Sequence, residues 1–169
     1  MPASPEIEIR QAKPQDAPAV AKVLCESFAE YEALYTRAGF LATTPNANEV
    51  LARMREGPVW LACREERVLG TVAAVAKGQS VYMRGMGVVP EARGSGIGPR
   101  FLECVEQWAH DHGCFRIFLS TTPFLNAAIR LYEKYGFRRT EEEPHDLFGT
   151  PLFTMEKNVH KHLADHDPN

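Results

Sequence analysis

The fold is decided by the stretch Arg93-Gly94-Ser95-Gly96-Ile97-Gly98, which joins an apolar run before it to an amphipathic run after it. Glycines at alternate positions allow several backbone N–H groups to point into one concavity. The helix expected to begin near Pro99 adds its unpaired first-turn N–H groups and the positive end of its dipole. Arg93 adds a positive charge. The stretch therefore predicts an anion site, with a plain glycine-rich turn as the structural alternative.

Two common phosphate motifs do not fit these residues. A P-loop requires Lys and then Ser or Thr after its last glycine, whereas Pro99-Arg100 follows Gly98. A dinucleotide fingerprint requires another glycine three positions after Gly96, where Pro99 stands. The anion is therefore not held by either of these loops.

The elements on both sides of the turn can be predicted from their patterns. The run Val81 to Val89 reads as a strand, and Gly85 and Gly87 within it indicate a bulge or a close approach of a ligand or another backbone. After the turn, apolar residues recur at helical spacing until Gly113. The local order is strand, glycine-rich turn and helix.

The remaining patterns extend this order to the whole chain. Asp16 is expected to cap a first helix, a loop follows, and Asn46 with Glu49 forms a capping box for a second helix that ends at Gly57-Pro58. The expected strands are Ile7 to Ala12, Val59 to Arg64, Val68 to Ala76, Val81 to Val89, Phe115 to Leu119, Phe137 to Thr140 and Leu152 to Met155, with a further helix over Ala128 to Tyr135. This order predicts an α/β layered domain with a mixed sheet of about seven strands and helices on its faces.

Composition restricts the class of protein. The chain has 169 residues, 44% hydrophobic content and a net charge of -3, which is typical of one globular domain and argues against a general nucleic-acid binder. No segment reaches the roughly 18 apolar residues that a membrane span needs, so a cytoplasmic location is expected. We expect a domain over residues 1–157 and a polar, flexible tail over 158–169.

Cysteine and histidine patterns predict no metal site. Cys25, Cys63, Cys104 and Cys114 form no C-x-x-C pair and are expected to be reduced, buried thiols. The tail histidines His160, His162 and His166 match no standard ligand spacing.

Two segments resemble one known family. The pattern Met83-x-x-Met86-x-Val88-x-Pro90-x-x-Arg93-Gly94-x-Gly96-Ile97-Gly98 resembles the signature of the GNAT superfamily of acyl-CoA N-acyltransferases, and Asn126 to Phe137 resembles its second motif. The resemblance covers about Ile7 to Lys157. It implies a mixed, mostly antiparallel sheet and the transfer of the acetyl group of acetyl-CoA to a primary amine by direct attack on the thioester.

The resemblance also implies roles for individual residues. Backbone groups of Met86, Gly87 and Val88 would hold the acetyl carbonyl and pantetheine arm where the strand splays from its neighbour. The pyrophosphate would lie against Arg93, Gly94, Ser95, Gly96, Ile97 and Gly98. Tyr132 would protonate the departing thiolate and Asn126 would contact the cofactor arm. From the residues alone, Tyr132 could instead be a core aromatic and Asn126 only a helix cap.

The acceptor side is less determined. Tyr82, Met83 and Arg84 stand where some family members carry an acidic or histidine base, so no base can be carried over. Candidates are Glu30, Glu32, His145 and Asp146, although residues of these types are more often solvated surface residues, and a water chain could replace them. Glu30, Arg84 and His145 are the expected acceptor contacts, with Arg84 facing a substrate carboxylate.

The function keeps two alternatives at this stage. The same fold could transfer a longer acyl group, or the chain could be a non-catalytic acyl-CoA-binding regulatory module. The amine acceptor is open among amino acids, polyamines, antibiotics, peptide N-termini and protein lysines. The oligomeric state is also open, with a homodimer favoured because two-fold assemblies are the most common.

Overall fold

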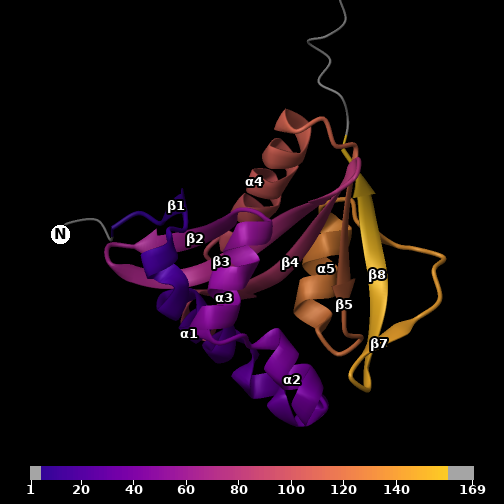
Figure 1. Ribbon diagram of the computed structural model, residues 1–169, viewed down its shortest axis with the longest axis horizontal. Coiled ribbons are helices and arrows are strands. Elements are labelled where there is room, and N and C mark those ends of the chain that lie inside the picture. Colours follow the sequence, from indigo (N-terminus) through magenta and orange to yellow (C-terminus); the bar gives the residue numbers. More distant parts are fainter. Residues whose placement is uncertain (1–4, 160–169) are drawn as a thin grey trace, which may run out of the picture.

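The computed structural model describes residues 5–159 and contains one mixed sheet flanked by helices (Figure 1). The strands are β1 Glu8–Gln11, β2 Val59–Arg64, β3 Arg67–Lys77, β4 Ser80–Val88, β5 Arg116–Thr121, β6 Arg138–Arg139, β7 His145–Leu147 and β8 Thr150–Asn158. The α-helices are α1 Ala17–Phe28, α2 Arg37–Thr43, α3 Ala47–Glu56, α4 Ile97–Asp111 and α5 Asn126–Lys134. Short 3-10 segments are η1 Pro14–Asp16, η2 Ala29–Leu34 and η3 Pro90–Ala92.

The sheet has eight strands in the order β1-β2-β3-β4-β5-β8-β6, with β7 paired to β8. Every pairing is antiparallel except that between β4 and β5. A parallel neighbour requires a long crossover connection, and α4 supplies it between these two strands. The predicted mixed, mostly antiparallel sheet is therefore confirmed, with one strand more than expected.

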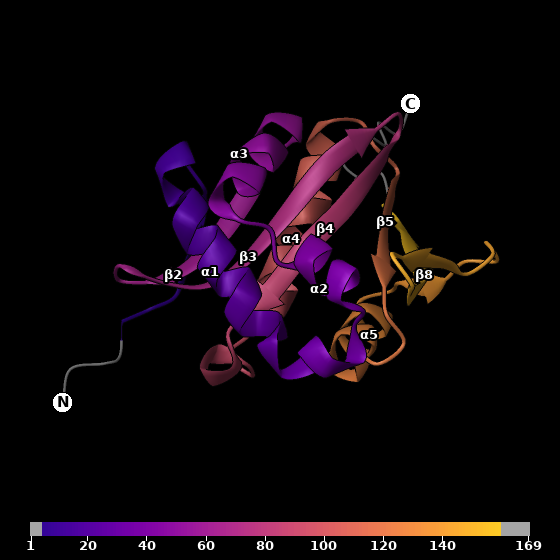
Figure 2. The same ribbon diagram turned by 60° about the horizontal axis from the view of Figure 1, so that its bottom comes forward.

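Helices cover both faces of the sheet (Figures 1 and 2). In β2, Leu61 and Cys63 pack with α1 and α3, whereas Ala62, between them, packs into the cluster of α4 and α5. Successive side chains point to opposite faces of a strand, so a strand covered on both sides must be apolar at nearly every position. This explains why β2 and β3 read as continuous apolar runs rather than alternating ones.

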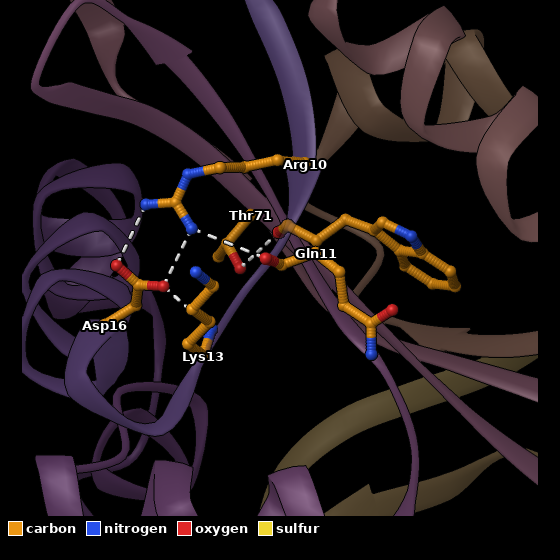
Figure 3. Close-up of polar contacts among 6 residues, drawn as sticks. Arg10, Gln11, Lys13, Asp16 and Thr71 are labelled. Carbon is orange, nitrogen blue, oxygen red and sulfur yellow. Dashed lines mark hydrogen bonds and ion pairs between the residues drawn. The ribbon is translucent and has the colours of Figure 1, made fainter.

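Asp16 holds the N-terminal strand to the start of α1 (Figure 3). Its carboxylate accepts hydrogen bonds from Arg10 at 2.8 and 2.9 Å and from the backbone N–H of Lys13 at 2.7 Å. Hydrogen bonding by Arg10 is the main cause that lowers the pKa of Asp16 to about 2. The predicted side-chain cap of α1 by Asp16 is wrong, because the carboxylate is engaged by Arg10 and Lys13 and makes no cap hydrogen bond to that helix.

Several local predictions can be compared with the structure. The capping box is confirmed, since Asn46 Oδ1 accepts from the backbone N–H of Glu49 at 2.9 Å and the Glu49 carboxylate accepts from that of Asn46 at 3.2 Å. The expected loop before Asn46 contains α2. The four cysteines are free thiols, but Cys25 is exposed and Cys104 only partly buried, whereas all four were expected to be buried.

The end of the chain also differs from the expectation. The short strand β7 was not predicted. Strand β8 continues to Asn158, and Val159 is buried with its N–H bonded to the carbonyl of Phe115 at 2.7 Å, so the packed structure extends past residue 157. The tail histidines lie outside the described residues. Within residues 5–159, no helix is long and apolar enough to span a membrane.

Candidate active site

Strands β4 and β5 diverge and open a cleft between them. They pair only where Ser80–Tyr82 meets Arg116–Phe118, although β4 continues to Val88 and β5 to Thr121. The cleft has a volume of about 760 Å³ and is lined by both free strand edges, the glycine-rich turn, α5 and parts of α1 to α3. Because unpaired strand edges expose N–H and C=O groups, this cleft can accept an extended chain carrying amides.

A bulge in β4 produces this divergence, as the glycines of the strand indicated. The register with β3 shifts so that Thr71 pairs with Gly87 and Ala73 with Arg84, which leaves two residues of β4, Gly85 and Met86, opposite one residue of β3. Gly85 has φ +58°, a left-handed conformation that other residues adopt at a cost. A bulge increases the local bend of a strand, so β4 turns away from β5.

The glycine-rich turn presents unsatisfied donors to the cleft. Gly94 and Gly96 both have φ +82°, and Gly96 is the residue immediately before α4. Within residues 5–159, no hydrogen-bond partner exists for the backbone N–H groups of residues 94–98. Donors at a helix N-terminus, where the dipole is positive, bind an anion. The geometry therefore fits a phosphate group of the predicted pyrophosphate.

Two residues of the first turn of α4 keep this end of the helix in place. Gly98 lies so close to α5 that a Cβ atom there would be 2.7 Å from Cδ2 of Leu131. The helix begins at Ile97, two positions before the predicted start near Pro99, so Pro99 is its third residue and has no N–H that needs a partner. The alternate glycines thus serve two purposes, since Gly94 and Gly96 shape the turn and Gly98 allows α4 and α5 to touch.

Arg93 is directed toward the helix layer rather than left free at the mouth of the turn. Its guanidinium donates to the carbonyl of Ser27 at 3.0 Å and forms an ion pair with Glu30. Arg93 lines the cleft, whereas Glu30 does not. Ser95 is exposed, and its hydroxyl donates to the carbonyl of Ala92. The sequence placed Glu30 with the acceptor, but the structure brings it to the base of the glycine-rich turn.

Tyr132 reaches the cleft from α5, while Asn126 does not. The side chain of Tyr132 is buried and packs against Phe137, with 5.7 Å between ring centroids. Burial, and to a smaller extent the neighbouring Tyr35, raises the pKa of Tyr132 above its ordinary value, so the phenol is neutral and can donate a proton. Asn126 is exposed at the first residue of α5, after Leu125 at the cap position.

At the far end of the cleft, α2 contacts the hairpin of β7 and β8, and both contribute to the lining. The backbone N–H of Thr36, which caps α2, donates to Thr150 Oγ1 at 2.9 Å, and Thr36 Oγ1 donates to the carbonyl of Phe148 at 2.8 Å. The lining here is aromatic and aliphatic, with Phe28, Tyr31, Tyr35, Leu147 and Leu152. Burial raises the pKa of Tyr35, which also remains neutral.

The charged side chains that line the cleft are all arginines, namely Arg53, Arg84 and Arg93. Among the described residues, no aspartate, glutamate, histidine or lysine lines it. The net charge of the protein is -3, so the sign of the charge in the cleft is opposite to that of the whole chain. A positive, partly enclosed site attracts anions and disfavours cations.

The candidate bases predicted for the acceptor side all lie outside the lining. Glu32 is exposed, and the Asp146 carboxylate accepts from the backbone N–H of Gly149 at 2.7 Å within the last hairpin. His145 is exposed but approaches the cleft through Ser120, with 3.2 Å between Nε2 and the Ser120 hydroxyl. No carboxylate or imidazole of residues 5–159 therefore reaches the cleft directly.

Several lining residues were not identified from the sequence. Tyr35 belongs to a group of aromatics near the first two helices that could line an acceptor pocket, although an apolar helical stripe more often belongs to the core. Thr122, which is buried beside Tyr35, carries no pattern. Arg53 had a usable signal, since it follows the buried Val50 by three positions on α3 and must share its inward face. An arginine on the buried face of a helix indicates a function or a partner.

Among residues 5–159, no group of three or more His, Cys, Asp or Glu side chains lies close enough to hold a metal ion.

Comparisons with known proteins agree with this geometry. Residues 21–137 match the sequence model of the acetyltransferase (GNAT) family. An uncharacterized N-acetyltransferase of Escherichia coli (strain K12), YjgM, is 31% identical over 140 residues, which cover 79% of this chain and 83% of that protein.

Solved structures share the fold at lower identity. The PaiA N-acetyltransferase of Thermoplasma acidophilum, in complex with coenzyme A, superposes with a TM-score of 0.77 at 18% identity, over 90% of this chain and 99% of that one. The putative acetyltransferase YncA of Salmonella typhimurium, with acetyl-CoA, gives a TM-score of 0.70 at 22% identity, over 95% and 98%.

Proposed function

The chain belongs to the GNAT family of acetyltransferases, and from this membership we propose that its cleft binds acetyl-CoA and passes the acetyl group to a primary amine. The observation that carries the proposal is the divergence of β4 from β5 directly beside a turn with unsatisfied N–H groups. The gap between the strands adjoins the anion site. Together they can accept a long molecule that has amides at one end and phosphates at the other. Bound acetyl-CoA supplies the acetyl thioester.

The donor is proposed to lie along the route that the predicted residues outline. The backbone N–H groups of Gly94, Ser95, Gly96, Ile97 and Gly98 would hold the pyrophosphate. The free edges of β4, at Met86, Gly87 and Val88, and of β5 would pair with the amides of the pantetheine arm. Thr122 Oγ1, which is buried beside the Tyr35 side chain, offers one more polar contact to that arm.

Arg93 has a supporting role in this proposal. Its guanidinium is occupied by Glu30 and Ser27, so it would contribute mainly a positive field and the attachment of the turn to α1. Asn126 is exposed and outside the cleft lining, and a contact with the cofactor arm would need a side chain or ligand movement.

Tyr132 is proposed as the general acid. When the amine nitrogen attacks the carbonyl carbon, a C–N bond forms, the C–S bond breaks and the sulfur leaves as a thiolate. The Tyr132 phenol, which burial keeps neutral by raising its pKa, would give its proton to that sulfur, and the phenolate would regain a proton from water. A backbone N–H of the bulged segment of β4 would stabilise the negative charge on the carbonyl oxygen as it develops.

The proton lost by the amine is proposed to leave through water. No carboxylate or imidazole of the described residues lines the cleft, so a base would have to act through an intermediate group. Ser120 and His145, which are joined by a hydrogen bond, form one such route. A cytoplasmic location and a homodimer, both expected from the sequence, remain predictions.

The test is the release of free thiol from acetyl-CoA in the presence of a panel of amines, with calorimetry of acetyl-CoA binding in parallel. We expect amine-dependent thiol release together with binding. Binding without release for any amine would favour the regulatory module, and faster release from longer acyl-CoA donors would favour transfer of a larger group. Absence of both binding and release would reject the proposal.

A further inference from the structure

We infer that the acceptor is an amine that also carries a carboxylate, held by Arg53 and Arg84 at the far end of the cleft. This inference rests on the proposed function and specifies the class of its acceptor. It begins from the charge of the lining, which contains these arginines and, within residues 5–159, no acidic side chain.

Arg84 retains free donors after its protein contact. It lies on β4 directly before the bulge, and its Nη2 donates to the Glu56 carboxylate at 2.7 Å. Its Nε is buried and has no hydrogen-bond partner in the described part of the chain. A guanidinium carries five N–H donors, so one hydrogen bond to Glu56 leaves most of its capacity for another oxygen-rich group.

Arg53 is the second guanidinium and, unlike Arg84, is paired with no acidic side chain of residues 5–159. It extends from α3 into the cleft, and its Nη2 donates to the carbonyl of Ala42 at 3.0 Å. No carboxylate of residues 5–159 forms an ion pair with it. Burial, and next the charge of Arg84, lowers the pKa of Arg53, but an arginine stays protonated in proteins.

The two guanidiniums repel each other in a partly desolvated place. The arrangement has two positive charges and only the half-exposed Glu56 in direct contact with one of them. A buried charge without a partner is costly, and a bound anion removes the cost when it accepts hydrogen bonds from both groups. A planar carboxylate has two oxygens and matches the fork of an arginine.

The position of Arg53 limits how far the carboxylate can be from the amine. Its Nη1 lies 3.5 Å from the point where a Cβ atom on Gly85 would stand, so the guanidinium touches the bulge. The proposed acetyl carbonyl lies along the next residues of β4. A carboxylate at Arg53 is therefore only a few bonds from the reacting nitrogen, as in an α- or β-amino acid.

The rest of this end of the cleft accepts an apolar group. Phe28, Tyr31, Leu147 and Leu152 form its walls, and the neutral phenols of Tyr35 and Tyr132 are close by. Amino acids with apolar side chains would fill this space. Polyamines and lysine side chains in basic segments would bring further positive charge toward Arg53 and Arg84 and are disfavoured.

The test uses matched acceptors that differ in the carboxylate. L-phenylalanine and L-leucine are each compared with their amide and with their decarboxylated amine, phenethylamine or isoamylamine, by thiol release from acetyl-CoA. The amide is less basic and the decarboxylated amine more basic than the acid, so amine basicity alone cannot favour the acid over both. We expect kcat/KM for the acid to exceed both analogues about tenfold or more.

Substitutions test whether the preference for the acid over the amide depends on the two arginines. Arg53→Gln and Arg84→Gln should each lower the ratio of acid to amide kcat/KM about tenfold. Arg55→Gln changes an exposed arginine of the same helix that does not line the cleft and should leave the ratio unchanged. Equal or better turnover of the amides and decarboxylated amines in the unaltered protein would overturn the inference while leaving the proposed function intact.

A binding measurement decides the inference if turnover is absent. N-acetyl-L-phenylalanine and its amide are titrated calorimetrically into the full chain saturated with coenzyme A. Tighter binding of the acid, lost in Arg53→Gln and retained in Arg55→Gln, would support the carboxylate site even if the proposed transfer fails. Equal binding of acid and amide, or no binding of either, would overturn it.

Discussion

The two ends of the cleft are formed by different groups of the protein, one by backbone and the other by side chains. The donor end consists of backbone N–H groups from the contiguous turn at residues 94–98, next to the free edges of two strands. The acceptor end consists of side chains from α1, α3, β4, η2 and the last hairpin. Backbone donors bind phosphate and amide groups in any acyl-CoA, whereas side chains can be exchanged without changing the fold.

This difference separates the part of the cleft that can bind any acyl-CoA from the part that selects the amine. The turn and bulge depend on glycines whose replacement would strain the chain, as at Gly96 with φ +82°. Arg53 and Arg84 stand at positions that other side chains could occupy without backbone strain. We expect changes at the donor end to alter affinity for acetyl-CoA, and changes at the acceptor end to alter the choice of amine.

The largest effect on activity is expected for Tyr132, which lies where the donor and acceptor ends meet. Tyr132→Phe should lower kcat about a hundredfold, because it removes the proposed proton donor, while changing the affinity for acetyl-CoA less than about twofold. Because the pKa of Tyr132 is raised, the unaltered protein should not lose kcat through this group between pH 7 and 9. Steady-state kinetics and calorimetry measure both quantities.

Tyr135→Phe is the matched control for this prediction. Tyr135 directly follows the same helix but does not line the cleft, and its variant should keep the original kcat. An undiminished rate in Tyr132→Phe would reassign Tyr132 to packing against Phe137.

A somewhat smaller effect is expected at the donor end. Gly96→Val places a side chain at φ +82° in the space before α4 and should weaken acetyl-CoA binding by at least about tenfold, roughly 1.4 kcal/mol. Calorimetry measures the affinity, and circular dichroism verifies the fold.

A control variant for the effect of backbone strain is available at the other end of the same helix. Gly113 has φ +69° and equally open surroundings, so Gly113→Val imposes similar strain away from the cleft. Unchanged affinity in Gly96→Val, or an equal loss in both variants, would remove the turn from the binding site.

Arg93 should matter less than the glycines beside it. Because its guanidinium is engaged by Ser27 and Glu30, Arg93→Gln should weaken acetyl-CoA binding only about threefold, through loss of a positive field that salt screens. The affinity of both proteins is measured at low and high ionic strength. A loss larger than that of Gly96→Val would mean that Arg93 turns toward the phosphate when the donor binds.

The smallest effect on either ligand is expected far from the cleft. Asp16→Asn removes the ion pair with Arg10 and should lower the free energy of unfolding at pH 7 by about 1 kcal/mol, a value reduced for partial solvent screening. The pKa of Asp16 is lowered from 3.8 to about 2, so this stabilisation is complete above pH 3.8 and disappears as the pH falls through about 2.

Urea unfolding at several pH values measures this difference, and calorimetry should find unchanged ligand affinities. A stability difference that persists below pH 2 would assign the effect to packing rather than charge. A change in acetyl-CoA affinity would show that stability alone alters the donor end, and the Gly96 result would then need reinterpretation.

The sequence alone was sufficient for the elements whose causes are local. The capping box at Asn46, the bulge marked by Gly85 and the strand, turn and helix around residues 81–113 follow from φ preferences, helix ends and periodicity, which act over a few residues. Strand β7 was missed because it has three residues and depends on pairing with β8. Asp16 was assigned to the wrong partner because Arg10 and the next helix compete for one carboxylate.

Only the tertiary structure decided which side chains form the acceptor end of the cleft. Arg53 and Arg84 are more than a helix length apart in sequence, and their meeting at the bulge depends on how α3 packs beside α1 over β4. In the folded chain, Glu30 pairs with Arg93, and the predicted bases lie outside the cleft. A turn binds through its own backbone, and a stretch of sequence can specify it. A pocket of side chains exists only after distant segments are brought together, so its charge could not be obtained from the composition of the chain.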